Sequence, residues 1–580
     1  MRATSRTVRL VIVGLIAAWI YLPGLGRPAL WEPDEGRYGE IAREMVVTGD
    51  YVTPRNNFEL YFEKPPLVYW ANAAAIRVFG ANEFAVRLPA ALFSIGQVVV
   101  TAAITETIFG AAIGILAALA LALSPIFFVF ARFATLDPAL AFFLTAALGA
   151  FIIAARAGSF SDRAARNWIL TAAALLALGT LAKGPVAIFL GAAIALVWLA
   201  LEHRLRDVAR MPLLWSAIIY VAIVAPWFIA IELRNPGFLQ FFFIHEHLSR
   251  YLASREHGWG PWFFVPIVAA GTWPWLYFAP CGWFAMRTAM NGSQSQPTSA
   301  GHSSDARFFA VWFVAIFVFF SIPRSKLGTY ILPALPPLAI FAGYGLSQIA
   351  VLDCAWRRVL LHGFTIVNLA LAGAAIFVLS RFVFPVQPDL ARDGIELAVG
   401  LGVGAATMDL IANRTRFAGY AFIAIAVTMF NATRLVERGR EHAASLYTYR
   451  NLAHTIAPYL APDCVLGSYR HYIQSIPFYT QRRETRVVYR GELSEVAPAS
   501  AAKSVFLIGS DARLRDVWSS AACMIIIAND RDLPALKDLL KPAPVIVGCE
   551  GKKFALYKGA GARAAAGDPA DCLNRASPAR

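Results

Sequence analysis

The chain has 580 residues, of which 58% are hydrophobic and only 15% are charged. Soluble domains carry about a quarter charged residues, so this composition excludes an ordinary soluble protein and indicates a membrane protein. The net charge of +15 would suggest a nucleic-acid partner for a soluble protein, but much of it lies in short segments between apolar stretches, where a positive-inside topology explains it, and we expect no nucleic-acid partner.

Apolar windows of spanning length recur along the first 430 positions. A span needs about 20 apolar residues, and we therefore predict a polytopic α-helical domain, residues 1–435. The first stretch, Val8 to Leu22, has no small-x-small cleavage site after it and is expected to stay as an anchor. The thirteen expected span centres lie near residues 16, 97, 120, 146, 175, 193, 222, 275, 315, 339, 369, 402 and 424.

Topology follows from the arginine-rich loops. With a cytoplasmic N-terminus these loops fall on the cytoplasmic side, as the positive-inside tendency requires. The odd number of spans then places the C-terminal tail outside. The segments near residues 23–83, 234–261 and 323–330 would all face the exterior.

The first exterior loop, residues 23–83, is too long for a simple connector, and long loops are usually functional. Gly36 to Val47 carries apolar residues on one helical face and charged residues on the other, which predicts an amphipathic helix in the interface plane. A second helix is predicted from Pro65-Pro66 to about Phe79.

The motif Trp31-Glu32-Pro33-Asp34-Glu35-Gly36-Arg37-Tyr38 follows the first span. Paired carboxylates at a membrane boundary are costly to desolvate, so we interpret Asp34 and Glu35 as catalytic and Arg37 as substrate-binding. The alternative is that Asp34 caps the helix beginning at Glu35. A cap needs only one carboxylate, and Arg37 does not complete a capping box, which favours the functional interpretation.

Lys64 stands immediately before the proline-initiated second helix, in Phe62-Glu63-Lys64-Pro65-Pro66. A cation at a helix N-terminus opposes the helix dipole unless an anion lies between them, and a phosphate would satisfy both. Lys64 is therefore a candidate ligand of a lipid phosphate. Snorkelling of the ammonium to the head groups is the alternative.

The second exterior loop contains His245-Glu246-His247-Leu248-Ser249-Arg250. Ser249 stands where a zincin would have its second histidine, so this is no zincin motif. His245 could still share a metal with a carboxylate from another loop, and Arg250 suits bidentate phosphate contact. Simple surface solvation remains open.

Further cations are expected at the exterior ends of spans, where positive-inside statistics disfavour them. Arg324 and Lys326 lie in the third loop, followed by Tyr330, and Lys183 ends another span. An anionic substrate would explain their position. Asp137 adds charge on the same side, although it could equally be the N-cap of the fourth span.

Acidic residues from one loop and basic residues from several therefore define an outward-facing site. Cations can stabilise a departing lipid phosphate while a carboxylate orients or deprotonates an acceptor. A transporter or flippase is the alternative class, but such proteins bury their charges within the spans rather than at span ends.

From about Val436 the composition becomes that of a soluble domain, and we predict a small α/β domain over residues 436–560, with residues 561–580 disordered. Four cysteines lie in this tail and allow three pairings, among which the sequence does not choose. Strands are expected at 464–468, 504–508, 524–527, 544–548 and 553–557. No Gly-rich nucleotide loop is present in the sequence, and we expect no nucleotide.

Together these motifs resemble the lipid A 4-amino-4-deoxy-L-arabinose transferases, which are related to the protein O-mannosyltransferases and share the GT-C membrane fold. The resemblance covers the membrane part and extends more weakly to the tail. The motifs that carry it are Asp34-Glu35 after the first span, Glu63-Lys64-Pro65-Pro66, His245 with Arg250, Lys326-Leu327-x-x-Tyr330-Ile331-Leu332-Pro333, and Tyr472 to Tyr479. Gly328 departs from the family, which usually has proline there.

The resemblance implies that Asp34 is the catalytic aspartate and that Lys64 and Arg250 bind the lipid phosphate. It also implies that Glu63 and His245 hold a divalent metal, expected to be zinc. The donor would be undecaprenyl phosphate bearing aminoarabinose, the acceptor a lipid A phosphate, and the site and tail would be periplasmic on the inner membrane. A hydroxyl acceptor on a protein or envelope glycan, as in the mannosyltransferases, stays open.

Overall fold

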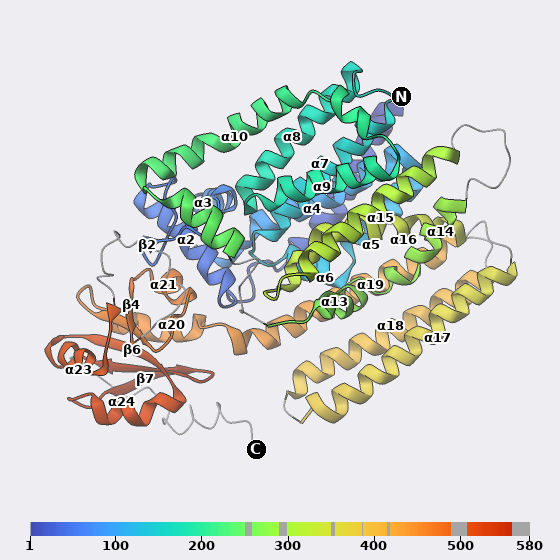
Figure 1. Ribbon diagram of the computed structural model, residues 1–580. Helices are drawn as coiled ribbons and strands as arrows, with labels where there is room; N and C mark the ends of the chain where they lie inside the picture. The colour runs from blue at the N-terminus through green and yellow to red at the C-terminus, as the bar shows by residue number, and fades with distance from the viewer. Residues whose placement is uncertain are drawn as a thin grey trace. The chain divides into compact units, whose positions relative to one another are not determined.

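The computed structural model describes residues 2–249, 258–288, 299–349, 354–385, 387–414, 418–488 and 507–559. The chain forms two compact units, whose elements are labelled in Figure 1. The membrane unit comprises Met1–Leu25, Leu88–Leu233 and Phe242–Gly439. The loop–sheet unit comprises Gly26–Arg87, Arg234–Phe241 and Arg440–Arg580. The first exterior loop thus groups with the C-terminal domain rather than with the spans.

The membrane unit is built from helices. Those that lie wholly or mostly in it are α1 (Arg2–Tyr21), α4 (Glu83–Phe109), α5 (Ala111–Ala122), α6 (Pro125–Ala131), α7 (Asp137–Arg156), α8 (Arg163–Lys183), α9 (Val186–Leu201), η1 (Leu205–Arg210), α10 (Leu213–Arg234), η2 (Phe241–Ser249), η3 (Pro261–Phe263), α13 (Phe264–Gly271), η4 (Trp275–Tyr277), α14 (Ala279–Thr288), α15 (Ser299–Ser321), η5 (Gly328–Ala334), α16 (Leu335–Ile349), α17 (Cys354–Val378), η6 (Leu379–Val383), α18 (Pro388–Arg414) and α19 (Ala418–Tyr447).

Each of the thirteen expected span centres falls within these helices or their breaks. Among the described residues, eight helices are long and apolar enough to cross a membrane, or up to ten if each of two bent pairs counts as one span. The pair α5 and α6 bends by 68° and the pair from Pro261 to Arg287 by 102°. Pro125 begins α6 and has no N–H for a helical hydrogen bond, which explains the first break.

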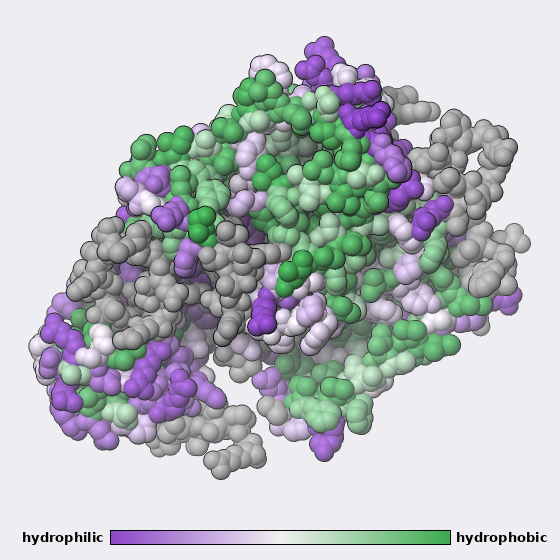
Figure 2. Space-filling model, in the orientation of Figure 1, coloured by the Kyte–Doolittle hydropathy of each residue, from purple (hydrophilic) through white to green (hydrophobic). Residues whose placement is uncertain are grey.

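Much of the surface of this unit is apolar, as the green residues in Figure 2 show. α17 is an extreme case, because most of its spanning window is exposed and its side chains Ile366, Leu369 and Phe377 are more than half exposed. Soluble proteins do not leave apolar patches of this extent open to water. The unit is therefore a bundle that faces lipid, as the composition predicted.

The loop part of the loop–sheet unit contains α2 (Asp34–Thr48), α3 (Leu67–Phe79), the short α11 (Phe238–Gln240), and a hairpin of β1 (Arg55–Asn56) and β2 (Glu59–Leu60). Both predicted helices are present. However, α2 is buried continuously from Glu35 to Met45, so its charged face is not solvated in an interface plane. Its charges are paired internally, for example in two 2.7 Å hydrogen bonds from Arg43 to Glu40.

The C-terminal part forms a six-stranded sheet of order β5-β4-β3-β6-β8-β7. The neighbours among β5, β4, β3 and β6 pair in parallel, whereas β8 runs antiparallel to both β6 and β7. All five expected strands appear, and β4 was missed because its four residues begin with Glu and contain Arg. The elements are α20 (Arg450–Ile456), η7 (Ala457–Tyr459), β3 (Val465–Tyr469), α21 (Ser475–Thr480), β4 (Glu484–Val487), β5 (Leu507–Ile508), α23 (Asp511–Ser520), β6 (Met524–Asn529), η8 (Asp530–Asp532), α24 (Leu533–Leu539), β7 (Val545–Glu550) and β8 (Lys553–Lys558).

Helices cover both faces of this sheet (Figure 1). Trp518 of α23 and Leu536 of α24 belong to the core on one face. Leu452 of α20 and Ile476 of α21 belong to the core on the other. The predicted α/β domain is therefore confirmed as a three-layer arrangement, while the expected disorder of residues 561–580 lies outside the described residues.

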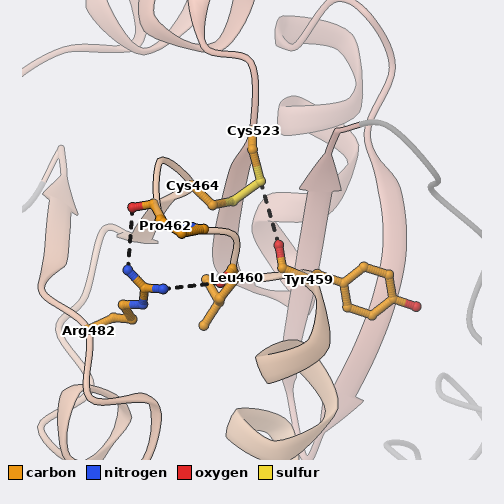
Figure 3. The surroundings of a disulfide bond; sticks show 6 residues. All are labelled: Tyr459, Leu460, Pro462, Cys464, Arg482 and Cys523. Atoms are coloured by element: carbon orange, nitrogen blue, oxygen red, sulfur yellow. Dashed lines mark hydrogen bonds between the residues drawn. A yellow bond between two sulfur atoms is a disulfide. The ribbon is translucent and has the colours of Figure 1, made fainter.

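A disulfide joins Cys464, just before β3, to Cys523, just before β6 (Figure 3). Arg482 donates hydrogen bonds to the carbonyls of Leu460 and Pro462 beside it. Of the three pairings that the sequence left open, this bond selects the one that joins the starts of two adjacent parallel strands.

Candidate active site

Asp34 is the first residue of α2 and is half-buried. The N-cap position is occupied by Pro33, and no side-chain hydrogen bond caps the helix. The alternative that Asp34 serves as an N-cap is therefore not supported. The structure leaves Asp34 as a candidate for chemistry.

Glu35 differs from its neighbour, because its carboxylate is wholly inside the protein. It accepts hydrogen bonds from Arg87 at 2.7 and 2.6 Å, and from the backbone N–H of Trp31 at 3.0 Å. Both members of the ion pair have no exposed side-chain surface. The carboxylate joins the backbone at Trp31 to the side chain of Arg87. This geometry favours a structural role over the catalytic one expected for Glu35.

Arg37, Tyr61 and Glu63 form a buried chain of polar contacts. Arg37 Nη1 donates to the Tyr61 hydroxyl at 3.4 Å, and that hydroxyl donates to Glu63 Oε2 at 3.0 Å. Burial, and then the charge of Glu63, raises the pKa of Tyr61 well above its ordinary value, which keeps the hydroxyl protonated as a donor. Tyr61 was missed from the sequence, although it stands directly before the motif that begins at Phe62.

Lys64 follows directly and is half-buried. Its ammonium donates to the backbone carbonyl of Glu63 at 3.1 Å. α3 begins three residues later, at Leu67, with Pro66 as its N-cap residue. The cation therefore lies just before a helix N-terminus, as the sequence predicted for a phosphate ligand.

The first residues of the second exterior loop pack against the first exterior loop. Within the loop–sheet unit, Arg234 pairs with Asp50 at 2.9 Å, and the ring of Phe238 lies 5.3 Å from that of Phe62. The prediction that these two loops share one side of the membrane agrees with this packing.

In the membrane unit, Asp137, Lys183 and Tyr330 come together from α7, α8 and η5. Lys183 forms an ion pair with Asp137, and its ammonium lies 4.1 Å from the centre of the Tyr330 ring. Asp137 is 4% exposed and begins α7 without a side-chain cap hydrogen bond. Its alternative role as an N-cap is therefore not supported, and the sequence signal for the cluster was the position of each residue at a span end.

The two cations of the third loop that were expected to bind substrate, Arg324 and Lys326, line one cavity but differ in exposure. Lys326 is 2% exposed and donates to the carbonyl of Trp259 at 3.0 Å and to that of Pro323. This ammonium ties two loops together, which favours a structural role for Lys326. Arg324 is exposed and lines a cavity of about 670 Å³ whose other walls are largely apolar, including Trp259 and Phe317.

The two residues predicted to bind the metal lie in different units. Glu63 belongs to the loop–sheet unit and His245 to the membrane unit. His245 is exposed on η2. Within the described part of the chain, no group of three or more His, Cys, Asp or Glu side chains could hold a metal ion. A zinc site on Glu63 and His245 stays a prediction. Arg250 lies outside the described residues.

Comparison with known proteins identifies the class. Residues 7–242 match the family model of dolichyl-phosphate-mannose-protein mannosyltransferases. The structure of ArnT from Cupriavidus metallidurans bound to undecaprenyl phosphate superposes with a TM-score of 0.82 and 28% identity, over 96% of this chain and 99% of that one. An oligosaccharyltransferase of Archaeoglobus fulgidus shares the fold alone, with a TM-score of 0.52 and 12% identity.

Fold and charge placement thus define an integral membrane protein of the GT-C fold with a C-terminal α/β domain. Two curated relatives are undecaprenyl phosphate-alpha-4-amino-4-deoxy-L-arabinose arabinosyl transferases. The one from Shewanella sediminis is 33% identical over 58% of this chain and 59% of its own length, and the one from Pseudomonas aeruginosa is 31% identical over 65% and 66%. The chain is similar to these arabinosyl transferases in sequence and to ArnT in fold. The alignment spans only about three fifths of the first relative's length.

Proposed function

We propose that the protein transfers 4-amino-4-deoxy-L-arabinose from undecaprenyl phosphate to a phosphate of lipid A at the periplasmic face of the inner membrane. The observation that carries the proposal is the superposition, over nearly the whole chain, on a structure that holds undecaprenyl phosphate. The relatives named for the same sugar donor support it.

The chemistry would be an inverting displacement. An oxygen of the acceptor phosphate bonds to the anomeric carbon of the sugar while the bond from that carbon to the donor phosphate oxygen breaks. Undecaprenyl phosphate leaves with the electron pair of the broken bond. Lys64, at the N-terminal side of α3, would stabilise the charge that develops on it.

Asp34 would orient the acceptor. A phosphate acceptor is already anionic near neutral pH, so no strong base is needed and positioning accounts for the contribution of Asp34. Lys183, held by Asp137 over the ring of Tyr330, would offer a second cation for anionic substrates. The carboxylates of Asp34 and Asp137 would thus serve different purposes.

A second candidate acceptor is a hydroxyl on a protein or glycan. The family model of protein mannosyltransferases, matched over residues 7–242, favours it. In that reaction Asp34 must accept the hydroxyl proton as a general base. The two candidates therefore differ in the pH dependence that they require of Asp34.

Mass spectrometry of lipid A tests the proposal. Cells that lack the gene are complemented with wild type, with Asp34→Asn, or with Asp389→Asn as a control carboxylate that is largely exposed at the start of α18. We expect the aminoarabinose mass increment with wild type and the control but not with Asp34→Asn. Unchanged lipid A in all strains would contradict the lipid A acceptor and direct the search to glycoproteins and other envelope glycans.

The periplasmic placement has its own test. The disulfide between Cys464 and Cys523 supports it, because such bonds persist in oxidising compartments. A reporter that is active only outside the cytoplasm, fused after the last residue, should be active. Activity of a cytoplasm-specific reporter at the same position would contradict this topology.

A further inference from the structure

Glu32 connects the loop that carries Asp34 to the C-terminal domain. Its carboxylate accepts the backbone N–H groups of Gln474 at 2.9 Å and Ser475 at 2.8 Å, at the start of α21. Its own N–H donates to the carbonyl of Tyr447 at 2.9 Å. Hydrogen bonds to a carboxylate are stronger than those between neutral groups, so two of them hold this side chain firmly. Asp34 lies only two residues further along the chain.

Gly36 shows how closely the two segments approach. A Cβ atom built on this residue would lie 2.6 Å from the backbone nitrogen of Ser475 and 2.9 Å from the carbonyl carbon of Gln474. Only a residue without a side chain fits between backbones at this distance. The first turn of α2 is therefore in direct backbone contact with the C-terminal domain on the side where Glu32 binds.

Asn57 forms a second connection at the tip of the β1–β2 hairpin. Its side-chain amide donates to the carbonyl of Glu484 at 2.7 Å, and its Oδ1 accepts the N–H of the same residue at 2.8 Å. The neighbouring Asn56 donates to the side chain of Gln474 at 2.8 Å. Both asparagines are completely buried. The hairpin tip is thus bonded to β4 in the way that a neighbouring strand would be.

The backbone at this tip is constrained as well. Asn57 and Phe58 have φ angles of 58° and 60°, in the left-handed region that bulky side chains avoid. Phe58 is held there because its N–H donates to Glu44 at 2.8 Å and its ring lies 4.2 Å from the guanidinium of Arg483. The tip therefore keeps a conformation that the isolated loop would disfavour.

The hairpin leads directly to the predicted phosphate ligand. Tyr61 closes it by donating its N–H to the carbonyl of Pro54 at 2.9 Å, and then donates its hydroxyl to Glu63. Lys64 follows at the next position. No flexible connection separates the anchored tip from this cation, because residues 61–63 are all buried.

We propose that Glu32 and Asn57 are positioning residues, through which the C-terminal α/β domain holds Asp34 and Lys64 in the geometry that sugar transfer needs. The proposal rests on the proposed function. It assigns the domain the role of a template for the active-site loop. The rate of sugar transfer is sensitive to shifts of about 1 Å in the position of a catalytic group. Loss of either connection should therefore lower catalysis without unfolding the domain.

The two connections predict different kinetic signatures. Glu32→Gln replaces one acceptor oxygen by a donor, removes one of the two bonds to α21, and lets Asp34 shift. We expect kcat to fall about tenfold with an unchanged KM for the donor, since Asp34 acts on the acceptor. Asn57→Ala frees the hairpin, and we expect the KM for the donor to rise about tenfold with a smaller change in kcat.

Glu550 provides a matched control. Like Glu32 it accepts a backbone N–H at the start of a short helix, that of Leu452 at 2.8 Å, together with the side chain of Asn451 at 2.9 Å. All three residues lie within the C-terminal domain. Glu550→Gln should therefore disturb a comparable contact while leaving both kinetic constants as in the wild type.

The experiment uses the purified full-length protein in lipid nanodiscs, with undecaprenyl-phosphate-linked aminoarabinose and lipid A as substrates. Hydrogen exchange of residues 55–64 is measured in parallel, and the melting temperature checks folding. The expected result is a kcat defect in Glu32→Gln, a KM defect in Asn57→Ala, and faster exchange of residues 55–64 in Asn57→Ala but not in Glu550→Gln.

The opposite results are equally clear. Kinetics of both variants that match Glu550→Gln would overturn the proposal, as would losses of kcat that merely follow the loss of folded protein. If the wild type does not use this donor, the proposed function fails. Hydrogen exchange then tests by itself whether Asn57 connects the hairpin to the C-terminal domain. Equal exchange rates in Asn57→Ala and Glu550→Gln would refute the connection.

Discussion

Arg87 encloses the carboxylate of Glu35 with two hydrogen bonds of 2.7 and 2.6 Å, and neither side chain touches solvent. The same guanidinium donates to the carbonyls of Pro28 and Ala29 at 2.6 and 2.9 Å. One arginine thus holds both the first residues of the loop and the first turn of α2. Asp34 is the first residue of that turn.

Arg87→Met should leave the charge of Glu35 buried without its partner. Breaking a buried pair costs about 3–5 kcal/mol, which is a large part of the stability of most proteins. We expect a strong loss of folded protein and a lower melting temperature in detergent. Arg450→Met is the control, because its pair with Glu83 has a side chain that is 34% exposed and should contribute less than about 1 kcal/mol. Equal melting temperatures for the two variants would contradict the assignment.

Gly36→Ala should disturb the contact between α2 and α21. The added methyl group meets backbone atoms of Ser475 at 2.6 Å, and backbone cannot rotate away. We expect activity to fall at least tenfold and the melting temperature to drop, by a cost of about 1–3 kcal/mol for an overpacked site. Gly400→Ala in α18, where nothing lies within 4 Å of the added atom, should be neutral or stabilising. A harmless Gly36→Ala would show that the two backbones can separate.

Tyr330 variants test the stacking of Lys183. The ammonium lies 4.1 Å from the ring centre, and a desolvated cation–π contact contributes about 2 kcal/mol. Tyr330→Phe keeps the ring and should keep kcat/KM within about twofold, whereas Tyr330→Leu should lower it by about tenfold or more. Steady-state kinetics with the lipid-linked donor measure both. An equal loss in the two variants would assign the effect to the hydroxyl instead.

Glu484 should make the stability of the loop–sheet unit depend on pH. Burial raises the pKa of this fully buried carboxyl from 4.5 to about 8. The folded state therefore holds a proton that the unfolded state releases, and stability falls as pH rises between these two values. Glu32, whose burial raises its pKa to about 7, acts in the same direction.

Two bases act in the opposite direction, in other ranges. Burial lowers the pKa of His471 from 6.5 to about 3, which adds stability as pH rises between those values. It lowers that of Lys553 from 10.5 to about 8, with the same effect above pH 8. We therefore expect the free energy of unfolding to fall by on the order of a few kcal/mol between pH 6.5 and 8, and the melting temperature to fall with it. Glu484→Gln should flatten this dependence on pH. An unchanged slope in the variant would contradict the prediction.

The disulfide provides a redox prediction. Reduction of the bond between Cys464 and Cys523, which are 59 residues apart, should cost about 2–5 kcal/mol. The C-terminal domain should then exchange its backbone hydrogens faster and be cleaved more readily by protease. Cys464→Ser, which removes this bond alone, should change both measurements in the same direction as reduction. Cys281→Ser, which removes a free cysteine, should not change either measurement.

Local sequence patterns predicted the elements well. Each of the thirteen expected span centres lies in a helix, although only eight to ten spans qualify by length and apolarity among the described residues. Turn and strand signals located five of the six strands in the C-terminal sheet. The motif around Asp34 and that around Lys64 are each continuous in sequence, so their residue types alone indicated a site. Such patterns depend only on neighbours within a few positions.

The missed features depend on residues that are distant in sequence. Arg87 lies 52 positions from Glu35, and Asn57 lies 427 positions from Glu484. No periodicity indicates which distant group a buried charge will meet, and for that reason the partners of Glu35 and Lys326 were not predicted. The amphipathic pattern of α2 was read correctly as a helix, but its polar face is covered by the rest of the unit.

The bond between Glu32 and Gln474 joins residues 442 positions apart, which has a consequence for biosynthesis. Ribosomes add about 5–20 residues per second, so the partner of Glu32 is made about 20–90 s after Glu32 itself. During that interval the loop between the first two spans lacks the surface that will hold it. Residues 26–87 are among the first to be translated and among the last to reach their final structure. A ribosome that stops before residue 440 leaves a fully inserted bundle whose loop has nothing to fold against.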